Sequence, residues 1–595
     1  MKNHIEPLWS VLPPPPDSFF DEYPELPKTV AHLLYHRNIR TQKKIDEFLN
    51  PDYPEDIHDP FLFQDMKKAT DRLFRAMEQN EKITIHGDYD ADGVSASVIL
   101  TSLFRAFQFD NFNVFLPHRE TDGYGLNKKT IGLLADEGTN VIITCDCGIS
   151  NREEVALANE KGIDVIITDH HTLPEIIPDA YAIIHPKREG ETYPDKTLAG
   201  GGVAFKLVEG MLKKHKTTHT LLPNGETHEA LEKWLLDMVA IASVADMVPL
   251  LGESRTLTKY GLIVLNKTRR IGLQKLLLEA RLMQEDGTKK REISADTIGF
   301  QIAPRINAAG RMNHANVAYN LLVTESPTDA IDLAFELNHN NQERQELVDV
   351  LIKEAVAQVE HNTSDQPFVF VIGDDWPTGV IGLIASRLKE RYYKPVLAMS
   401  QQTNEVVGSG RSIKGFDMIA TLQEIPHFFS KFGGHPMACG LTLTSPDVLS
   451  EFQETVTTLF LEKTTDEDRR PILEIDAEIM LDDVQWELYD ILEKFKPFGQ
   501  ANPKPKYVAK GVTVVGIEPV GKTKQHLRLM VQQHSPKIRK TIGWGLCDEN
   551  QGGKCDWSKR LKRGDKIDMI FEIDVNEWNG NRELQLTIVD LKQIS

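Results

Sequence analysis

Four short apolar runs, each ending in acidic or histidine side chains, constrain the fold of this chain more than any other feature. They are KITIHGD, NVFLPH, NVIITCDCG and DVIITDHH, between residues 82 and 171. Stretches compatible with amphipathic helices separate them. Near-continuous Val/Ile runs of this kind are typical of a parallel sheet covered by helices on both faces. Residues 61–325 are therefore predicted to form an α/β domain, with ligands bound beyond the carboxyl ends of its strands.

The rest of the chain divides into four further regions by pattern. Residues 1–60 read as a proline-rich N-terminal extension, irregular with short helical pieces. Residues 326–362 are helix-compatible throughout, and Ser326 can cap them, so we expect a long connecting helix. Residues 363–462 predict a smaller α/β domain, with strands at PFVFVIGD and KPVLAMS. Residues 463–595 show short strands joined by turns, which is typical of a small β-barrel such as an OB-fold.

Charge is distributed unevenly along the 595 residues. The whole chain carries a formal net charge of −20, which disfavours coating of its entire surface by nucleic acid. Residues 496–566, in contrast, hold 16 Lys and Arg against 5 Asp and Glu. Tyr507, Trp544 and Trp557 lie among these cations, so we expect a basic, aromatic platform for a single strand. A plain solvated basic surface is the alternative.

Composition also bears on the compartment. Five cysteines form no disulfide framework in a chain of this length, which indicates a reducing, cytoplasmic environment. The start MKNHIEPLWSVLPPPP has no apolar segment typical of a secretory signal. The most apolar long stretch, WLLDMVAIASVADMVPLLG, carries Asp237 and Asp246, and we expect buried protein there, not a membrane span. The CDC triplet at 145–147 lacks a second cysteine pair at zinc spacing, so zinc is not expected there.

The stretch HGDYDADG, residues 86–93, crowds three aspartates together. Asp88, Asp90 and Asp92 match the start of an EF-hand calcium loop. The twelfth position of that loop requires Glu but is Ile99 in this chain, and an apolar strand precedes the stretch where a helix is needed. The calcium-loop interpretation therefore fails. Because like charges repel, we expect another positive partner for these carboxylates.

Four clusters along the chain supply ligands for such a partner, three of them at ends of the predicted strands. Their oxygen-rich composition suits Mn²⁺ or Mg²⁺. Two such ions about 4 Å apart can activate a bridging water and clamp a phosphoester. Any single aspartate could instead be a helix N-cap, but four clusters together favour a two-metal site. The clusters are His86, Asp90 and Asp92; Asp146; Asp169, His170 and His171; and Asp246.

The glycine run in LAGGGVAFKL, residues 198–207, is similar to a phosphate-binding loop. It lacks the Gly-Lys-Ser/Thr ending that such loops need to contact phosphates and Mg²⁺. Close packing of a helix against its neighbours is the favoured interpretation.

Several motifs together resemble a known family. HGDYDADG, CDCG, DHH and ADMVPL match, in order and spacing, motifs I to IV of the DHH phosphoesterase superfamily, and GGHPMACG (433–440) is similar to the motif of its companion DHHA1 domain. The match extends through PHRETDGYGLN, APRINAAGRM, GSGRSIKGFD, FKPFGQANPKP and EWNGNRELQLTIVDL. Nearly the whole chain thus resembles the RecJ family of bacterial single-stranded-DNA-specific 5′→3′ exonucleases, in its shorter form without a further C-terminal domain.

The resemblance implies a hydrolase that releases mononucleotides from single-stranded DNA during DNA repair and recombination, with two divalent cations, Mn²⁺ or Mg²⁺, as cofactors. It implies that Asp146 bridges the two cations and acts with His171, which faces the scissile phosphate. Asp88 is expected to support catalysis by orienting the ligands. The implied ligands are His86, Asp90 and Asp146 for one cation, and Asp92, Asp146, His170 and Asp246 for the other.

The resemblance also implies contacts to the strand. Arg119, Ser409 and Arg411 are expected to hold its 5′ end, the latter two from a glycine-flanked loop suited to a phosphate. His435 is expected to reach the substrate phosphate from the second domain, so that the active site lies in an interdomain cleft. A surface salt bridge is the alternative for any one of the arginines. The other implied contact residues are Tyr124, Arg305, Arg311 and Gly434.

As partners, the resemblance implies single-stranded DNA, a single-strand-binding protein and a helicase, with no membrane and with the protein as a monomer. Two other functions stay open. One is a DHH phosphatase or nano-RNase acting on very short substrates, whose members are generally shorter and lack the barrel. The other is a catalytically inactive scaffold that binds single strands, although such proteins lose ligand carboxylates that this chain retains.

Overall fold

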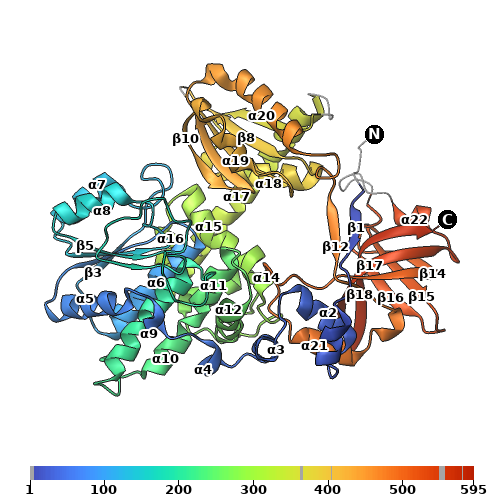
Figure 1. The fold of residues 1–595 in the computed structure, drawn as a ribbon, viewed down its shortest axis with the longest axis horizontal. Coiled ribbons are helices and arrows are strands. Elements are labelled where there is room, and N and C mark those ends of the chain that lie inside the picture. Colours follow the sequence, from blue (N-terminus) through green and yellow to red (C-terminus); the bar gives the residue numbers. More distant parts are fainter. Residues whose placement is uncertain (1–5, 362–365, 404, 549–555, 579, 595) are drawn as a thin grey trace. The chain divides into compact units, whose positions relative to one another are not determined.

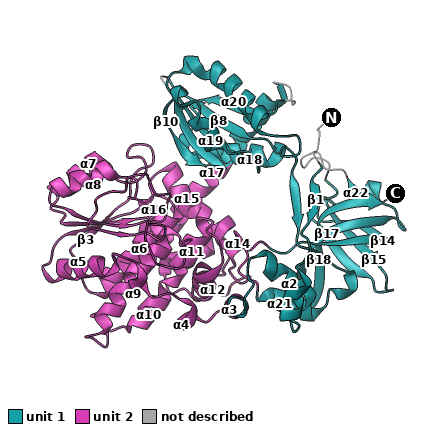
Figure 2. Ribbon diagram, in the orientation of Figure 1, with its two compact units in different colours: residues 1–45, 346–494, 504–595 teal, residues 46–345, 495–503 magenta. Residues whose placement is uncertain are grey.

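The structure, a computed structural model, describes residues 6–361, 366–403, 405–548, 556–578 and 580–594. It divides into two compact units (Figure 2). Unit 1 comprises residues 1–45, 346–494 and 504–595, and unit 2 comprises residues 46–345 and 495–503.

Unit 2 contains a five-stranded sheet (Figure 1). Its order is β3-β2-β4-β5-β6 and every neighbouring pair is parallel, as the apolar runs predict. Because β3 and β4 lie on opposite sides of β2, the carboxyl ends of β2 and β4 flank a topological switch point, where α/β sheets bind ligands. The strands are β2 (Ile83–His86), β3 (Phe112–Phe115), β4 (Val141–Cys145), β5 (Asp164–Thr168) and β6 (Ala182–Ile184).

Helices cover both faces of this sheet. On one face, Ile143 and Ile166 pack in a core with α5 (Met66–Glu78), α6 (Ala91–Ala106) and α9 (Gly200–Lys216). On the other, their neighbours Ile142 and Ile167 pack with α7 (Lys128–Asp136) and α8 (Arg152–Glu160). This alternation explains why the strands read as continuous apolar runs. Unit 2 also contains α10 (His228–Trp234), α11 (Leu236–Ala245), α12 (Gly252–Leu265), α13 (Ile271–Glu279), α14 (Ala295–Thr297), the π-helical turn η2 (Ile298–Ile302), α15 (Ala303–Met312) and α16 (Asn316–Val323).

The predicted long helix is present as α17 (Pro327–His361). The backbone N–H of Asp329 donates to Ser326 Oγ at 3.3 Å, which confirms the predicted N-cap. Residue 362, its expected end, lies outside the described residues.

A mixed five-stranded sheet of order β10-β11-β9-β8-β7 lies in unit 1. Only β7 and β8 run parallel, and the other pairs are antiparallel. Apolar side chains of α19 and aromatic side chains of α20 pack on one side of it, and α18 packs on the other. The elements are β7 (Val369–Asp374), α18 (Thr378–Tyr392), β8 (Val396–Gln401), β9 (Val406–Arg411), α19 (Met418–Gln423), β10 (Phe429–His435), β11 (Ala438–Leu443) and α20 (Leu449–Lys463).

A closed barrel follows in unit 1, which confirms the predicted OB-fold. Its strands pair in the order β14-β15-β16-β18-β17, and β17 pairs back to β14. Only β16 and β18 run parallel within this ring. The closed five-stranded ring leaves few free strand edges. The strands are β14 (Tyr507–Val520), β15 (His526–Gln532), β16 (Arg539–Gly543), β17 (Lys566–Trp578) and β18 (Asn581–Ile594).

The N-terminal residues contain a strand as well as the expected short helices. β1 (Leu8–Val11) pairs in parallel with β12 (Ile472–Ile475), and Trp9 Nε1 donates to Asp590 Oδ2 at 2.8 Å. The strand escapes sequence reasoning because its partner lies more than 450 residues along the chain. The helices are α1 (Asp17–Glu22), α2 (Lys28–His36), α3 (Gln42–Leu49) and α4 (Tyr53–Asp56).

Candidate metal centre

The turn after β2 holds three carboxylates in a tight space. Asp90 is the N-cap of α6, and its Oδ1 accepts hydrogen bonds from the N–H groups of Asp92 (2.9 Å) and Gly93 (3.1 Å). A Cβ atom at Gly93 would lie 2.6 Å from Asp88. Glycine at that position therefore allows the turn to bring Asp88 against the first turn of α6.

Asp146 follows β4 in an unusual backbone conformation. Its φ of 61° lies in the left-handed region, which costs a residue with a side chain about 1 kcal/mol or more. A Cβ atom at Gly200 would lie 2.5 Å from the Cβ of Asp146, so only glycine fits there. Asp146 is thus held buried against the start of α9 in a strained backbone conformation.

Asp169, the first residue of the DHH triplet, orients the two histidines. Its Oδ1 accepts from the backbone N–H groups of His170 (2.7 Å) and His171 (3.1 Å) and lies 2.8 Å from His171 Nδ1. Its Oδ2 accepts from the N–H of Ile149 at 2.9 Å. Both carboxylate oxygens of Asp169 are therefore used in hydrogen bonds that orient the histidines and the neighbouring backbone. The sequence pattern alone did not indicate this role.

The ligating atoms converge into three overlapping groups, within each of which the atoms lie no more than 4.8 Å apart. Asp146 and His170 each belong to two groups, and Asp146 Oδ1 lies 3.1 Å from His170 Nε2. Shared ligands of this kind suit two adjacent cations. The groups are Asp92, His170 and Asp246; Asp146, His170 and His171; and Asp88, Asp90 and Asp146.

Burial and mutual repulsion raise the pKa values of four carboxylates in the cluster. Burial and Asp92 raise the pKa of Asp146 well above its ordinary value, and burial and Asp246 do the same for Asp92. Burial and Asp90 raise the pKa of Asp88, and they raise that of Asp246 to about 7. Nearby positive charge is needed to keep all of these groups ionised at neutral pH.

The histidines divide into two electrostatic classes. Burial, with the charge of His171, lowers the pKa of His170 to about 3, and burial lowers that of His86 to about 4. Both rings are therefore neutral and have a lone pair for a metal. Burial also acts to lower the pKa of His171, but the hydrogen bond and charge of Asp169 outweigh it and raise the value to about 9.

Several buried polar atoms of the cluster have no hydrogen-bond partner. They are His86 Nε2, Asp88 Oδ1, Asp146 Oδ1 and His170 Nε2. An unpaired buried polar atom costs about 1–3 kcal/mol, so four of them in one cluster need an explanation. Divalent cations fit this donor set of carboxylate oxygens and imidazole nitrogens.

The glycine run at the start of α9 completes the cluster. The N–H groups of Gly200 and Gly201 donate to the two carboxylate oxygens of Asp92 at 2.7 and 2.6 Å. A Cβ atom at Gly201 would lie 2.6 Å from the Cβ of Ala242. The predicted close packing is therefore confirmed, and the helix N-terminus adds positive potential beside Asp92.

Two predicted roles look different in the structure. Asp88 lies in one of the converging groups, although the sequence assigned it a supporting role. His86 does not belong to any of these groups, and its Nδ1 lies 3.9 Å from the Sγ of Cys147. Its Nε2 is nevertheless buried without a partner, so His86 as a ligand stays a prediction.

Asn307 belongs to the site but was not predicted. Its Oδ1 accepts a hydrogen bond of 2.7 Å from the backbone N–H of Ala91, between two of the clustered aspartates. Three residues on, a Cβ atom at Gly310 would lie 2.7 Å from the carbonyl oxygen of Tyr89. The small residues of INAAG thus permit a close backbone approach, and α15 supports the turn after β2.

Arg119 and Tyr124 lie near the cluster. The Arg119 guanidinium lies 4.1 Å from the ring centre of Tyr89, and its Nε is buried without a partner. The hydroxyl of Tyr124 donates to the carbonyl oxygen of Asp146 at 3.0 Å and lies 3.1 Å from His171 Nδ1. Tyr124, predicted to contact the strand, therefore also braces His171.

Arg305 and Arg311 both lie on α15. Arg305 Nε donates to Asn338 Oδ1 at 3.0 Å, and its Nη1 donates to the carbonyl oxygen of Gln301 at 2.7 Å. Arg311 lies in the last turn of the helix and is half-buried. Phosphate contact by either residue stays a prediction.

The prediction that Ser409 and Arg411 lie in a loop is wrong, because both residues belong to strand β9. A Cβ atom at Gly410 would lie 2.4 Å from Met418 Sδ and 2.5 Å from Cys439 Sγ. The glycines therefore provide room for packing on one face of the strand and do not mark a turn. The alternation of β9 directs Ser409 and Arg411 to the other face, where Arg411 Nη1 donates to Ser409 Oγ at 3.1 Å.

Gly434 and His435 lie at the end of β10, where its hairpin with β11 turns. Gly434 has a φ of 145°, and a Cβ atom there would lie 2.3 Å from the carbonyl oxygen of Ala438. Glycine is therefore required for the hairpin to close. His435 is exposed at this turn and available to a ligand.

Only one of the three aromatic side chains expected on the barrel platform is exposed. Tyr507 is completely buried and Trp557 is 8% exposed, so both are core residues and cannot stack on a strand. Trp544 is 59% exposed, and its ring centre lies 4.8 Å from that of His526. The three aromatic residues therefore differ in solvent exposure, and their nearness to lysines in the sequence does not predict which of them is exposed.

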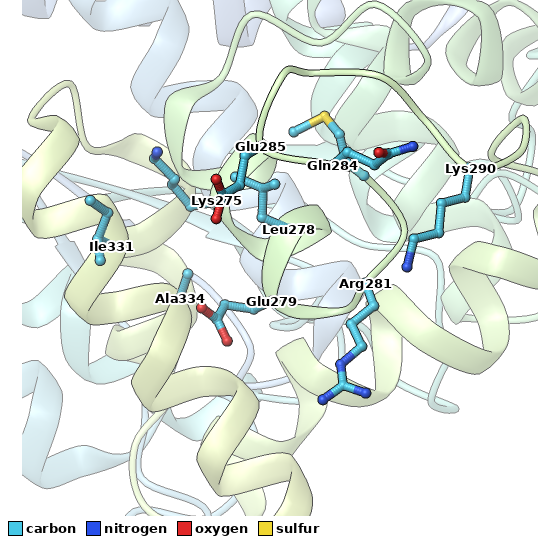
Figure 3. A pocket seen from close by; sticks show the side chains of 10 residues that line it. Lys275, Leu278, Glu279, Arg281, Gln284, Glu285, Lys290, Ile331 and Ala334 are labelled. Carbon is cyan, nitrogen blue, oxygen red and sulfur yellow. The ribbon is translucent and has the colours of Figure 1, made fainter.

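Unit 2 also contains a cavity of about 570 Å³ (Figure 3). Its lining mixes the cations of Lys275, Arg281 and Lys290 with the carboxylates of Glu279 and Glu285. None of the predicted site residues lines it, so this cavity is not the candidate metal centre.

None of the helices in the described part of the chain is long and apolar enough to span a membrane. α11, which holds much of the most apolar stretch, is instead buried in the core of unit 2.

The chain matches three domain families. Residues 82–243 match the DHH family, N-terminal domain, residues 365–462 match the DHHA1 domain, and residues 475–590 match the RecJ OB domain.

Full-length similarity is also clear. The chain is 36% identical to the single-stranded-DNA-specific exonuclease RecJ of Bacillus subtilis, over 98% of this chain and 70% of that protein. It is 30% identical to RecJ of Escherichia coli, over 95% of this chain and 96% of that protein.

Solved structures share the fold. RecJ from Thermus thermophilus in complex with Mn²⁺ is similar with a TM-score of 0.80 at 24% identity, over 99% of this chain and 80% of that one. An exonuclease RecJ bound to manganese has a TM-score of 0.57 at 28% identity, over 68% of this chain and 97% of that one. By its domains, its full-length identity and its carboxylate–histidine cluster, this chain belongs to the RecJ family of single-stranded-DNA-specific exonucleases.

Proposed function

We propose that this chain hydrolyses single-stranded DNA from its 5′ end to mononucleotides, with two divalent cations, Mn²⁺ or Mg²⁺, at the carboxylate–histidine cluster. The observation that carries the proposal is the sharing of ligands, because Asp146 and His170 each belong to two converging groups. Two cations held there supply the charge that polarises a water and a phosphodiester. The relatives named for this activity include proteins solved with Mn²⁺.

His171 is assigned to the substrate phosphate. In the metal-free protein Asp169 raises the pKa of His171 to about 9, so its ring is protonated at neutral pH and suited to an anion. Asp169 and the Tyr124 hydroxyl hold the ring from its Nδ1 side. The two partners fix the orientation of the His171 ring, so little side-chain conformational entropy is lost when substrate binds.

We assign phosphate contacts to residues of each unit. In unit 2, Arg119 carries a buried Nε without a partner. In unit 1, Ser409 and Arg411 lie side by side on β9, and Ser386 Oγ accepts from Arg411 Nε at 3.1 Å. A guanidinium fixed in this way suits the terminal phosphate of a strand, and we assign these residues to the 5′ end.

We assign to the barrel the binding of the single strand beyond its 5′ end. It carries most of the basic segment 496–566 and exposes Trp544, which matches the combination of cations and aromatic rings that single-strand sites use.

The test uses one oligonucleotide in four forms: labelled at the 5′ or the 3′ end, and with that same end free or chemically blocked. In Mn²⁺, the proposal expects labelled mononucleotide at once from the 5′ label and only at the end of digestion from the 3′ label. A block at the 5′ end is expected to stop release, and a block at the 3′ end is expected to leave it unchanged. Immediate release of labelled mononucleotide from the 3′ label would show that degradation runs from the 3′ end, which contradicts the proposal.

Substrate length separates this function from the alternatives. Faster turnover of a dinucleotide than of a long oligomer would indicate a nano-RNase. Tight binding of the oligomer with no mononucleotide in Mn²⁺ would indicate an inactive scaffold.

The partners form a finer part of the proposal. We assign the protein to the cytoplasm as a monomer that works with a helicase and a single-strand-binding protein in repair and recombination. Light scattering of the purified protein tests the monomer. Exonuclease rates on strands coated with single-strand-binding protein, or unwound by a helicase, test the cooperation.

A further inference from the structure

Two apolar side chains are unusually exposed near the candidate metal centre. Phe300 is 80% exposed and Met247 is 68% exposed, more than any other large apolar residue of the described chain. No aromatic ring among the described residues pairs with that of Phe300. Large apolar side chains presented to solvent in this way are typical of binding surfaces.

Phe300 lies in the π-helical turn η2, directly before α15. Pro304 has no N–H, so the carbonyl of Phe300, four residues earlier, receives no helical hydrogen bond from it. The N–H of Ala303 bonds instead to the carbonyl of Ile298, five residues back. π-helical turns of this kind are frequent at functional sites, and this one accompanies the outward-facing ring.

Met247 directly follows Asp246, one of the clustered carboxylates. Its φ of 56° lies in the left-handed region, which favours glycine at the end of a helix. The chain therefore holds an apolar side chain both in solvent and in a strained conformation, beside a candidate metal ligand.

The two segments lie against each other. η2 packs on α11, and the Cβ position of Gly299 lies 3.8 Å from Val244 Cγ1. The N–H of Met247 bonds back to the carbonyl of Val244 at 3.3 Å, so Met247 lies one turn beyond this contact. Along the same helical run, Asn307 contacts the turn that holds the clustered aspartates. Phe300 and Met247 thus lie on neighbouring helical segments, each of which also carries a residue of the candidate metal centre, Asn307 and Asp246.

Resting on the proposed function, we propose that Phe300 and Met247 form a base-stacking surface for the DNA strand at the metal centre, a contact that complements the phosphate contacts. The occupant is a nucleobase, because every base has a π-face and the surface carries an aromatic ring without hydrogen-bonding groups. Arg305 and Arg311 follow on the same helical run and supply positive charge for the strand backbone. Stacking of this kind tolerates any sequence, as an exonuclease requires.

The experiment measures strand affinity and turnover for Phe300→Ala, Phe300→Leu and Phe300→Trp. The matched control is Phe335→Ala, which removes another exposed ring of unit 2, on α17. Binding is measured in chelator, so that no strand is cut, with a 5′-phosphorylated oligonucleotide that carries 2-aminopurine at successive positions. We expect quenching at one position in the wild type, and about tenfold weaker binding with loss of that quenching in Phe300→Ala. Trp is expected to restore both, and Leu to restore neither.

Abasic oligonucleotides test stacking without any variant. The wild type is expected to lose about tenfold in affinity when the abasic residue occupies the position that is quenched, whereas Phe300→Ala is indifferent to that residue. Wild-type affinity in Phe300→Ala, or an equal loss on intact and abasic strands, would overturn the proposal. Since Mn²⁺-dependent degradation by the wild type is measured in parallel, its absence would instead indicate failure of the proposed function.

Discussion

Asn307 Oδ1 accepts a 2.7 Å hydrogen bond from the backbone N–H of Ala91, which joins α15 to the turn that carries the clustered aspartates. Ala91 lies between the N-cap Asp90 and Asp92. A side chain that contacts no ligand thus holds the backbone from which two candidate ligands project. Partners of this kind orient metal ligands and tune metal affinity.

Asn307→Ala is therefore expected to weaken Mn²⁺ binding about 10- to 100-fold, because the turn loses its support. Isothermal titration of Mn²⁺ into the metal-free protein measures it. Asn316→Ala, an exposed change on α16, is the control. Unchanged Mn²⁺ affinity in Asn307→Ala would show that the turn holds its shape without this bond.

Asp92→Ala is expected to cost far more activity than Asp88→Asn. Asp92 shares a group with His170 and Asp246 and accepts two backbone hydrogen bonds from α9, so its removal empties one half of the cluster. We expect a loss of about 10³-fold or more for Asp92→Ala and about tenfold for Asp88→Asn, measured as mononucleotide release at saturating Mn²⁺. Equal losses would mean that Asp88 is a ligand of the same rank, as its place in a converging group permits.

Metal affinity is expected to rise with pH. In the metal-free protein the pKa of Asp246 is raised to about 7, so this carboxyl is mostly protonated at pH 6 and mostly ionised at pH 8. Mn²⁺ binds the ionised form, so its apparent affinity is expected to increase about tenfold between these values, with protons released on binding. His170 and His86, with lowered pKa values, are neutral throughout and do not oppose this trend. Titrations in two buffers that differ in ionisation enthalpy measure the released protons, and Asp246→Asn is expected to release fewer protons than the wild type, while Asp92 and Asp146 still contribute.

Arg411→Gln is expected to reduce the preference for a 5′-phosphorylated strand over a 5′-hydroxyl strand. Its guanidinium is fixed by Ser409 and Ser386, so neutralising it removes a prepared phosphate contact worth about 1.5–3 kcal/mol. The measurement compares KM for the two strands in wild type and variant. Lys389→Gln, at the basic end of α18, is the control for a general loss of charge. An unchanged ratio in Arg411→Gln would remove this residue from the 5′ site.

The position of the candidate metal centre could be predicted from the sequence, because parallel strands bring their carboxyl ends to one edge of the sheet. The residues after β2, β4 and β5 had to meet there, whatever the details of the helices. Sequence reasoning did not reach Asn307, because a single tertiary hydrogen bond to Ala91 leaves no pattern in the chain. It misread Ser409 and Arg411 as loop residues, because glycines that make room for Met418 and Cys439 look like glycines that make a turn. It also took Tyr507 for a surface ring, although β14 directs that side chain into the barrel core.

Asp146 belongs to two converging groups and is the proposed carboxylate shared between two cations, so one comparison at this residue tests the site most directly. Wild type and Asp146→Ala are titrated with Mn²⁺ while mononucleotide release from a 5′-phosphorylated single strand is followed. We expect the wild type to bind two Mn²⁺ ions and to release mononucleotides, and we expect Asp146→Ala to bind fewer ions, to lose activity about 10³-fold or more, and to keep its fold and strand affinity. Undiminished release by Asp146→Ala, at the same Mn²⁺ stoichiometry, would contradict the shared-ligand site.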